Sequence, residues 1–539
     1  MADPATAAEV LPSRGSRLDS HMTRRPGAKS IALFLAALAG GMCFIAFHVS
    51  RDMKTVTVTS IWPYLLLALA LLIALGFEFA NGFLDTANAV ATVIYTHSLD
   101  PTTAVVLSGF CNLAGVLASS GAVAFAIITL LPVDLILQVS SGSGYAMVFA
   151  LLIAAILWNM GTWWLGLPAS SSHTMVGSII GVGIANQLFN PHVGASGVDW
   201  EQAIKILKVL LISPFVGFML GGLVMVVSKR LLKYPSLFEA PKDKQPPPWP
   251  IRALMVLTCT GVSFFHGSND GQKGMGLIML ILIGTVPTAY ALNHAVTAND
   301  IQQFISASEQ AGHILDRYVG QNSAHSSNAR AEVTDYIRTQ KLRPETILAL
   351  RELVGDVSHT VGQYKVFRSI PAQEQTIVRN DMYVAGEALR LMDKNHAPAF
   401  TAEEDTGLRN YRTRLDKSTK FIPNWVKVAV ALALGLGTMV GWKRVVITVG
   451  EKIGKEHLNY AQGASAGLVT MGTIFAATRL GLPVSTTHIL SSGVAGTMAA
   501  NGSGLHLSTI RNIAAVWVFT LPSAALLSGL LYWLFRAIS

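Results

Sequence analysis

The sequence predicts an all-α, polytopic membrane protein built from two inverted repeats with broken helices and re-entrant helical hairpins, plus a soluble helical insert. Of its 539 residues, 51% are hydrophobic and 13% are charged, and several apolar runs approach the roughly 20 residues that a helix needs to cross a bilayer. Two short polar blocks each occur twice, in the same order, within these runs. Duplicated polar blocks in apolar helices are typical of internally repeated membrane proteins.

The first 30 residues form a basic N-terminal tail, and an apolar segment follows over residues 31–49. The tail lacks the compact apolar core and the small-residue cleavage site of a secretory signal. Five basic residues lie in it: Arg14, Arg17, Arg24, Arg25 and Lys29. We expect residues 1–30 to be a polar tail and residues 31–49 to be an extra transmembrane helix.

The remaining apolar segments form two series with the same order. In the first repeat, residues 61–230, we predict an interrupted helix over 61–97, a helix over 104–131, apolar arms over 145–167 and 172–187, and a helix over 206–228. In the second repeat, residues 252–289 and 422–536, the corresponding segments are 252–289, 423–449, 463–482 with 487–500, and 509–536.

A long polar stretch divides the second repeat. Asp85 and Pro168 lie 83 residues apart in the first repeat, whereas their counterparts Asp270 and Pro483 lie 213 residues apart, an excess of 130. Residues 290–421 account for this excess, and their apolar residues recur at helical intervals without a spanning run. We predict a water-soluble helical insert there. Its histidines are too scattered for a metal site, so we expect solvated helical faces.

The first polar block reads Asn81-Gly-Phe-Leu-Asp85-Thr-Ala-Asn88 and returns as His266-Gly-Ser-Asn269-Asp270-Gly-Gln-Lys273. Glycine permits turns and close approach, so we predict that each block breaks its helix, at Asn81-Gly82 and around Asp270. Backbone freed inside a bilayer has to line an enclosed cavity. Ionisable groups at this depth are costly unless paired or hydrated. Asp85, Asp270 and Lys273 are therefore site candidates, and a structural ion pair between the halves is the alternative.

The second polar block reads Pro168-Ala-Ser-Ser-Ser-His173 and returns as Pro483-Val-Ser-Thr-Thr-His488. Each follows a short apolar arm ending in Gly-Leu-Pro, which predicts a re-entrant hairpin whose polar triplet opens the returning helix. Unpaired N–H groups at a helix N-terminus and adjacent hydroxyls together make an anion site. Plain N-capping is the alternative. His173 and His488 could pair with the aspartates, relay protons or be structural.

Re-entrant hairpins would leave three true spans in each half, so the second half would insert upside down. We expect the two hairpin tips to meet at the midplane, as in a secondary transporter with alternating access. Basic residues do not settle the orientation. The segments 229–252 and 409–420 both have the basic composition of cytoplasmic loops, although they are one span apart. One of these assignments, or the span count near 252–289, has to be wrong.

Four motifs in this order resemble those of the inorganic phosphate transporter (PiT) family. Its repeated Gly-x-Asn-Asp-x-x-Asn core is similar to the segment Gly267–Lys273 and, in a more degenerate form, to Gly82–Asn88. The hairpin segment Pro483–His488 resembles the family sequence almost letter for letter, and His266–Gly276 resembles the bacterial low-affinity branch. The resemblance covers about residues 61–289 and 422–536.

The resemblance implies that the protein carries inorganic phosphate. The implied phosphate-binding residues are Ser170, Ser171, Ser172, Ser485, Thr486 and Thr487, and the implied cation-coupling residues are Asp85, Asn88, Asn269, Asp270 and Lys273. Sodium-coupled members usually have Asn where Lys273 stands, and an ammonium group would take the space and charge of a sodium ion. We therefore expect symport with protons, or transport of a neutral divalent metal–phosphate complex, with sodium coupling as the alternative.

Other function classes fit the sequence less well. Another tetrahedral oxyanion such as sulfate is the nearest rival as substrate. An anion channel would need rings of basic residues, and no nucleotide motif, metal cluster or nucleophile–base pair indicates an enzyme such as a phosphatase. The net charge of +9 lies mainly in loops and termini, which favours a lipid bilayer over nucleic acid as its partner. We expect a multi-pass protein of the bacterial inner membrane, without a cofactor, that could form a homodimer.

Overall fold

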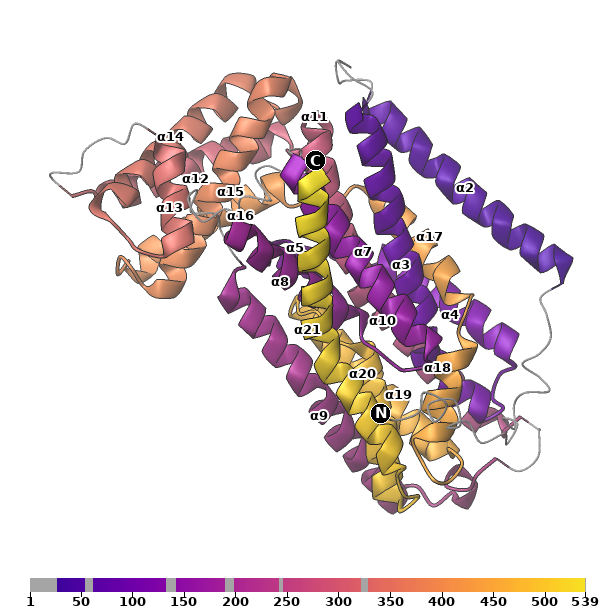
Figure 1. Cartoon of the computed structure of the whole chain (residues 1–539). Coiled ribbons are helices and arrows are strands. Elements are labelled where there is room, and N and C mark those ends of the chain that lie inside the picture. Colours follow the sequence, from indigo (N-terminus) through magenta and orange to yellow (C-terminus); the bar gives the residue numbers. More distant parts are fainter. Residues whose placement is uncertain are drawn as a thin grey trace, which may run out of the picture.

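The computed structural model describes residues 27–53, 62–131, 142–189, 198–241, 246–320 and 328–538, and these ranges are almost entirely helical (Figure 1). They contain one isolated β-bridge, Gly454–Leu505, and no strand. The predicted all-α class is confirmed. The predicted basic tail lies outside the described residues up to position 26.

The helices follow the predicted series. The first half contains α2 (Ala28–Asp52), α3 (Trp62–Tyr95), α4 (Pro101–Leu117), α5 (Ala122–Ile128), α7 (Gly142–Trp164), α8 (Ser171–Phe189) and α9 (Trp200–Leu231). The second half contains α10 (Trp249–Thr285), α17 (Asn424–Thr438), α18 (Lys443–Ile447), the π-helical turn η6 (Thr448–Lys452), α19 (Tyr460–Arg479), α20 (Thr486–Asn501) and α21 (Leu507–Ile538).

Between α10 and α17 lie α11 (Pro287–Tyr290), α12 (Ala298–Asp316), α13 (Ala329–Thr339), α14 (Pro344–Tyr364), α15 (Ala372–Asn395) and α16 (Ala402–Thr419). Helices α12–α16 surround a hydrophobic cluster of their own, whereas Tyr290 of α11 belongs to a cluster of the long helices. Of the described helices, five are long and apolar enough to cross a membrane, or up to seven if each of two bent helix pairs counts as one span.

The structure corrects the position of the helix breaks. α3 and α10 run unbroken through the two polar blocks, so the predicted interruptions at Asn81-Gly82 and around Asp270 are wrong. The glycines serve close helix contacts instead: a Cβ on Gly82 would lie 2.1 Å from the Leu434 carbonyl oxygen, and one on Gly267 would lie 2.1 Å from that of Asn112. The side chains of Asp85, Asn88, Asp270 and Lys273 find partners on other helices, while the backbone of α3 and α10 stays helical.

The breaks occur in neighbouring segments that the sequence predicts as single helices. The segment predicted over 104–131 divides into α4 and α5, which are bent by 75° at a turn where Gly121 has a φ of +89°. The segment predicted over 423–449 divides into α17 and α18 at Gly441, whose φ is +72°. α4 ends at Leu117 and α17 ends at Thr438, and the two glycines lie in the turns that follow, where left-handed backbone favours glycine.

Each of four close helix pairs combines one helix from either half. α3 packs on α17, α4 on α10, α8 on α21 and α9 on α20, with glycines against the facing backbone in every pair. In the order of the two halves, α3 corresponds to α10 and α4 to α17, so exchanging the halves turns the pair α3–α17 into α10–α4. In the same way, it turns the pair α8–α21 into α20–α9. Two repeats that share one interface would pair in this way. The inverted relation between them stays a prediction that these pairings support.

The helices around α12–α16 lie at one end of the bundle, which we name the insert end (Figure 1). At the start of α9, Asp199 accepts from Arg390 at 3.4 Å and Glu201 accepts from Lys394. Near the other end of α9, Lys229 donates to the carbonyl of Asn501. A helix of 32 residues is about 48 Å long, so the segment after α9 lies at the end opposite the insert, the far end.

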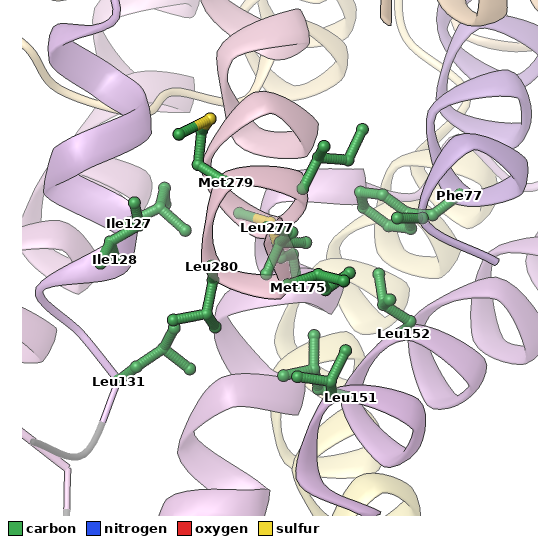
Figure 2. Packing of buried hydrophobic residues seen from close by; sticks show 14 of the residues in the cluster. Phe77, Ile127, Ile128, Leu131, Leu151, Leu152, Met175, Leu277, Met279 and Leu280 are labelled. Atoms are coloured by element: carbon green, nitrogen blue, oxygen red, sulfur yellow. The ribbon is translucent and has the colours of Figure 1, made fainter. Parts of the chain in front are cut away.

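Two hydrophobic clusters divide the bundle along its length. One, toward the insert end, contains the first part of α3 up to Phe77 and the last part of α10 from Met275; Figure 2 shows Phe77, Met175 and Leu280 from three of its helices turned toward one another. The other contains the last part of α3 from Ala87. The two polar blocks lie between these clusters, where apolar side chains exclude water on both sides.

Candidate functional site

Asp85 and Asp270 lie together where α3 crosses α10. The imidazole of His266 lies between them, with its Nε2 3.5 Å from Asp85 Oδ2 and 3.6 Å from Asp270 Oδ2. All three residues are at most 4% exposed. Two carboxyl groups buried this closely need positive charge or hydrogen-bond donors around them.

Lys273 and Asn88 supply such donors at matching places in the two halves. Lys273 Nζ donates to Asp270 Oδ2 at 2.5 Å and to Ser172 Oγ at 2.5 Å. Asn88 Nδ2 donates to Asp85 Oδ1 at 2.8 Å and to Thr487 Oγ1 at 2.8 Å. Each donor thus joins the aspartate three residues before it to the last hydroxyl of one hairpin triplet.

The last hydroxyls of the two triplets complete this exchange between halves. Ser172 Oγ donates to the carbonyl of Val484 at 2.7 Å, at the tip of the second hairpin. Thr487 Oγ1 donates to Asp85 Oδ1 at 2.5 Å. The sequence assigns anion binding and cation coupling to two separate groups of residues. In the structure, hydrogen bonds connect residues of both groups in one network.

The first hydroxyls have a different place. Ser170 Oγ accepts from the backbone N–H of His173, and Ser485 Oγ accepts from that of His488, both at 3.2 Å. These two residues cap α8 and α20, which is the plain N-capping that the sequence left open. Their hydroxyl oxygens are thus engaged with their own helices.

The middle hydroxyls distinguish the two hairpins. Ser171 Oγ lies 3.1 Å from Asp85 Oδ2 and 3.4 Å from Asp270 Oδ2, and its proton is directed to this carboxylate pair. Its counterpart Thr486 is 2% exposed, and its hydroxyl has no hydrogen-bond partner among the described residues. Thr486 is the hydroxyl in the triplets that is free to bind a ligand.

The hairpin tips contact each other, as the sequence predicts. The rings of His173 and His488 have centroids 4.4 Å apart, and His488 also stacks on Trp517 at 4.0 Å. His173 Nδ1 lies 2.9 Å from Ser170 Oγ. The two histidines therefore contact each other, Ser170 and Trp517 of α21, rather than Asp85 or Asp270.

Asn269 belongs to the second hairpin rather than to the carboxylates. Its amide donates to Thr478 Oγ1 at 3.0 Å and to the carbonyl of Leu482 at 3.1 Å. Its Oδ1 accepts from the backbone N–H of Val484 at 3.4 Å. These bonds fix the tip, so the structure places Asn269 apart from the cation-coupling group in which the sequence put it.

The hydrogen bonds around His266 fix which nitrogen faces the carboxylates. Asn112 donates through its amide nitrogen to Thr438 Oγ1 at 3.0 Å, and Thr438 donates to the carbonyl of Leu434. The Asn112 oxygen therefore faces His266 Nδ1, at 2.8 Å, and Nδ1 carries a proton. His266 Nε2 is then left to hold a second proton toward Asp85 and Asp270, or to bind a cation there.

Sequence reasoning missed two site residues. His266 stands inside the quoted motif, and its position one turn before Asp270 on the same helix face was the available signal. Glu78 is fully buried seven residues before Asp85, on the same face of α3. Glu78 and Asp85 are the only two charged residues in α3, so a lone Glu in an apolar helix was a signal as well.

The donor set can bind an anion and a cation together. The atoms of Asp85, His266 and Asp270 that could bind a metal ion lie within 4.8 Å of one another. However, the ammonium of Lys273 already neutralises one of these carboxylates. The hydroxyl of Thr486 and the N-termini of α8 and α20 supply donors of the kind that bind tetrahedral oxyanions.

Comparison with known proteins gives the chain its family. The model of the phosphate transporter family matches residues 81–528. The low-affinity inorganic phosphate transporter PitB of Escherichia coli is 38% identical, over 88% of this chain and 97% of that protein. PitA of the same organism is 41% identical, over 87% and 96%. A solved structure titled "The sodium-dependent phosphate transporter" aligns with 88% of this chain and 100% of that chain at 19% identity, with a TM-score of 0.48. The chain belongs to the phosphate transporter family.

Proposed function

We propose that this protein is a low-affinity inorganic phosphate transporter that crosses a bacterial inner membrane several times. PitA and PitB are described as low-affinity inorganic phosphate transporters, and this chain matches nearly the whole length of both. The observation that carries the proposal is the meeting of two hydroxyl-bearing helix ends over the buried Lys273–Asp270 pair. Substrate sites of secondary transporters are built from helix ends of this kind.

Phosphate binding would use donors that come from both halves. Thr486 offers a buried hydroxyl, and Ser171 could turn its proton from the carboxylates to a phosphate oxygen. The ammonium of Lys273 would add positive charge beside them. Hydroxyl and N–H donors recognise tetrahedral oxygens more than the central atom, so sulfate and arsenate are the competitors to test.

The charges of the site support transport of phosphate together with a cation. Three buried carboxyl groups, Glu78, Asp85 and Asp270, face one lysine and one histidine. Even with all five groups charged, the sum is −1, and a phosphate monoanion would bring it to −2. Net charge of this size is costly in a water-excluded interior. Co-bound protons, or a divalent metal carried with phosphate, would remove that cost.

We further propose that protons are the coupling ions. In the first half, an uncharged amide, Asn88, joins Asp85 to its hairpin. In the second half, the ammonium of Lys273 makes the matching bonds and occupies the place where a sodium ion would have to bind Asp270. A resident ammonium group and a sodium ion would exclude each other by charge and volume.

Radiolabelled phosphate uptake by the purified protein in proteoliposomes tests the function. We expect saturable uptake that competes with arsenate more than with sulfate, and we expect Asp270→Asn to abolish it because Lys273 loses its carboxylate. Glu309→Gln, at an exposed position in the insert, is the control. Gel filtration and thermal unfolding of the Asp270→Asn protein have to show that it is folded. Wild-type uptake by this variant would return Asp270 to a structural role.

A further inference from the structure

Glu78 is a buried acid that the network around Asp85 and Asp270 does not include. Its side chain is 0% exposed, and neither carboxyl oxygen makes a hydrogen bond of regular geometry among the described residues, although the Asn81 amide and the Gly274 backbone lie beside it. The Asn81 amide, one turn further along α3, is equally buried and also makes no hydrogen bond of regular geometry. A buried polar pair left in this way carries a large desolvation cost, which a purely structural role would not explain.

The fold makes room for this acid. Gly274 of α10 lies against it, and a Cβ on Gly274 would come within 2.5 Å of Glu78 Oε1. Glu78 precedes Asp85 by two helical turns, about 10 Å, toward the insert end. Phe77, the residue before it, belongs to the hydrophobic cluster on that side. Glu78 is therefore the last acidic group of α3 between the central network and the apolar part of the bundle.

Few charged groups face Glu78. From α10, Lys273 and Asp270 act on it electrostatically, and from its own helix the nearby polar group is Asn81. α4 and α7 contain no charged residue, and the one charged residue of α17, Lys427, donates to the carbonyl of Ser119. The ammonium of Lys273 is itself bonded to Asp270 and Ser172. Glu78 thus senses the charge of the site without being bonded into it.

The second half has no acid at the matching place. The residue seven positions before Asp270 is Ser263, which bonds to Ser108 Oγ at 2.8 Å and to the carbonyl of Cys259. That position is fully satisfied by uncharged partners. An acid at Glu78 is therefore not needed to pack the repeat, and it adds one negative charge to one side of the site.

We propose that Glu78 is a proton-binding site of the transport cycle. It takes up one proton as phosphate enters and releases it after phosphate leaves, so that the added charge of the monoanion is offset. Asp85 and Asp270 are less suited to this task because they already accept hydrogen bonds from Asn88, Thr487 and Lys273. This inference rests on the proposed phosphate transport.

Two uptake assays on the full-length protein in proteoliposomes test it. Phosphate exchange at equal pH on both sides needs no net proton movement, whereas accumulation driven by an inward proton gradient does. Because each phosphate would cross with a proton that moves down its gradient, an inward proton gradient should accelerate wild-type uptake several-fold. In Glu78→Gln we expect the factor to fall to about one while exchange persists. Ser263→Ala, at the matching position, should keep both activities.

The outcomes separate this inference from the function on which it rests. No phosphate exchange by the wild type would refute the proposed function itself. Full proton stimulation in Glu78→Gln, or loss of exchange in a folded Glu78→Gln protein, would overturn the role of Glu78 and leave phosphate transport intact. If Gln is not tolerated, Glu78→Asp keeps a carboxyl group that is withdrawn by one methylene. It should retain proton stimulation with an altered pH profile, and loss of the stimulation in a folded Glu78→Asp protein that still exchanges phosphate would count against the proposal.

Infrared spectroscopy gives a readout that does not depend on transport. A protonated carboxylic acid has a carbonyl stretching band that a carboxylate lacks. We expect the difference spectrum between acidic and alkaline pH to contain such a band in the wild type and to lose it in Glu78→Gln. The same band in both proteins would show that Glu78 does not bind the proton.

Discussion

Lys273 and Asn88 occupy matching places, yet one is a cation and the other a neutral amide. Replacing Lys273 by Asn would make the halves alike and would leave Asp270 without its ammonium. Removing one partner of a buried ion pair costs about 3–5 kcal/mol, so Lys273→Asn should lower the melting temperature clearly. If the ammonium stands in for a sodium ion, added sodium should restore part of this loss by binding the folded state.

The control for this experiment is the wild-type protein in the same sodium titration. Its melting temperature should not respond to sodium beyond the effect of an equal concentration of potassium. A variant that sodium does not stabilise, or a wild type that sodium does, would contradict the assignment of Lys273 as the built-in cation.

Thr486 and Thr487 are adjacent but have opposite surroundings. Thr487 Oγ1 bonds to both Asn88 and Asp85, whereas the hydroxyl of Thr486 has no partner among the described residues. Leaving buried groups unsatisfied costs about 1–3 kcal/mol, so Thr487→Val should destabilise the phosphate-free protein by that amount. Thr486→Val should leave its stability nearly unchanged and weaken phosphate binding. Equal melting temperatures for both variants would refute this network.

The sequence located the chemistry of the site better than its geometry. The repeated motifs predicted Asp85, Asp270 and the hydroxyl triplets, because charge and hydroxyls are rare in apolar helices. Nothing in the motif letters showed that Ser170 and Ser485 would cap their helices while Thr487 and Ser172 would bond across the halves. These roles depend on which helix faces which, and that is a property of the packed structure.

At the level of helices, glycines on α3 have two different environments. Gly82 lies against the backbone of α17, whereas Gly76 is exposed, and a Cβ added there would have nothing within 4 Å. Alanine is favoured over glycine in a helix by about 1 kcal/mol, but overpacking costs about 1–3 kcal/mol or more. We expect Gly82→Ala to lower the melting temperature and Gly76→Ala to keep or raise it. The reverse order would show that α3 and α17 are not in close contact.

The positions of the helix breaks could not be predicted from the sequence. Gly82 and Gly121 are both glycines in apolar surroundings, and the sequence favoured a break at Gly82 because polar residues follow it. In the structure, Gly121 has a positive φ and directly precedes the first residue of α5, whereas Gly82 is helical. The difference lies in the neighbour: the backbone of α17 stands where a side chain at position 82 would be.

The first turn of α16 in the insert is predicted to respond to pH. Glu404 accepts from the backbone N–H of Thr401, from Tyr318 OH and from Arg317, and these bonds hold its pKa at about 2. A pKa below the usual value means that ionised Glu404 stabilises the fold at neutral pH and that this contribution is lost as the pH falls toward 2. The stability difference between wild type and Glu404→Gln should therefore shrink in the same range. A difference independent of pH would contradict it.

At the scale of the whole molecule, the structure favours one of the two orientations in the membrane that the sequence left open. The described parts of the first basic segment, residues 229–241 and 246–252, lie at the end of the bundle opposite residues 409–420, so the two segments cannot both be cytoplasmic. Basic residues in short loops determine orientation, whereas large domains cross the membrane largely regardless of charge. The far end has the short basic segment with Lys229, Arg230 and Lys233. We therefore expect the far end in the cytoplasm and the insert on the outer face.

Single cysteines at exposed positions can check this orientation in a background without Cys43, Cys111 and Cys259. In intact cells with a permeable outer membrane, a thiol reagent that does not cross the inner membrane should label Thr413→Cys in the insert. It should label Lys233→Cys only after the inner membrane is opened. The opposite pattern would place the insert in the cytoplasm.

The central claim is that phosphate crosses with protons because Lys273 takes the place of sodium. Its most direct test is phosphate uptake into proteoliposomes with sodium and proton gradients imposed independently, with and without divalent metal. We predict uptake that does not require sodium and that collapses when the proton gradient is removed. Strict dependence on sodium, with no response to the proton gradient, would contradict the claim.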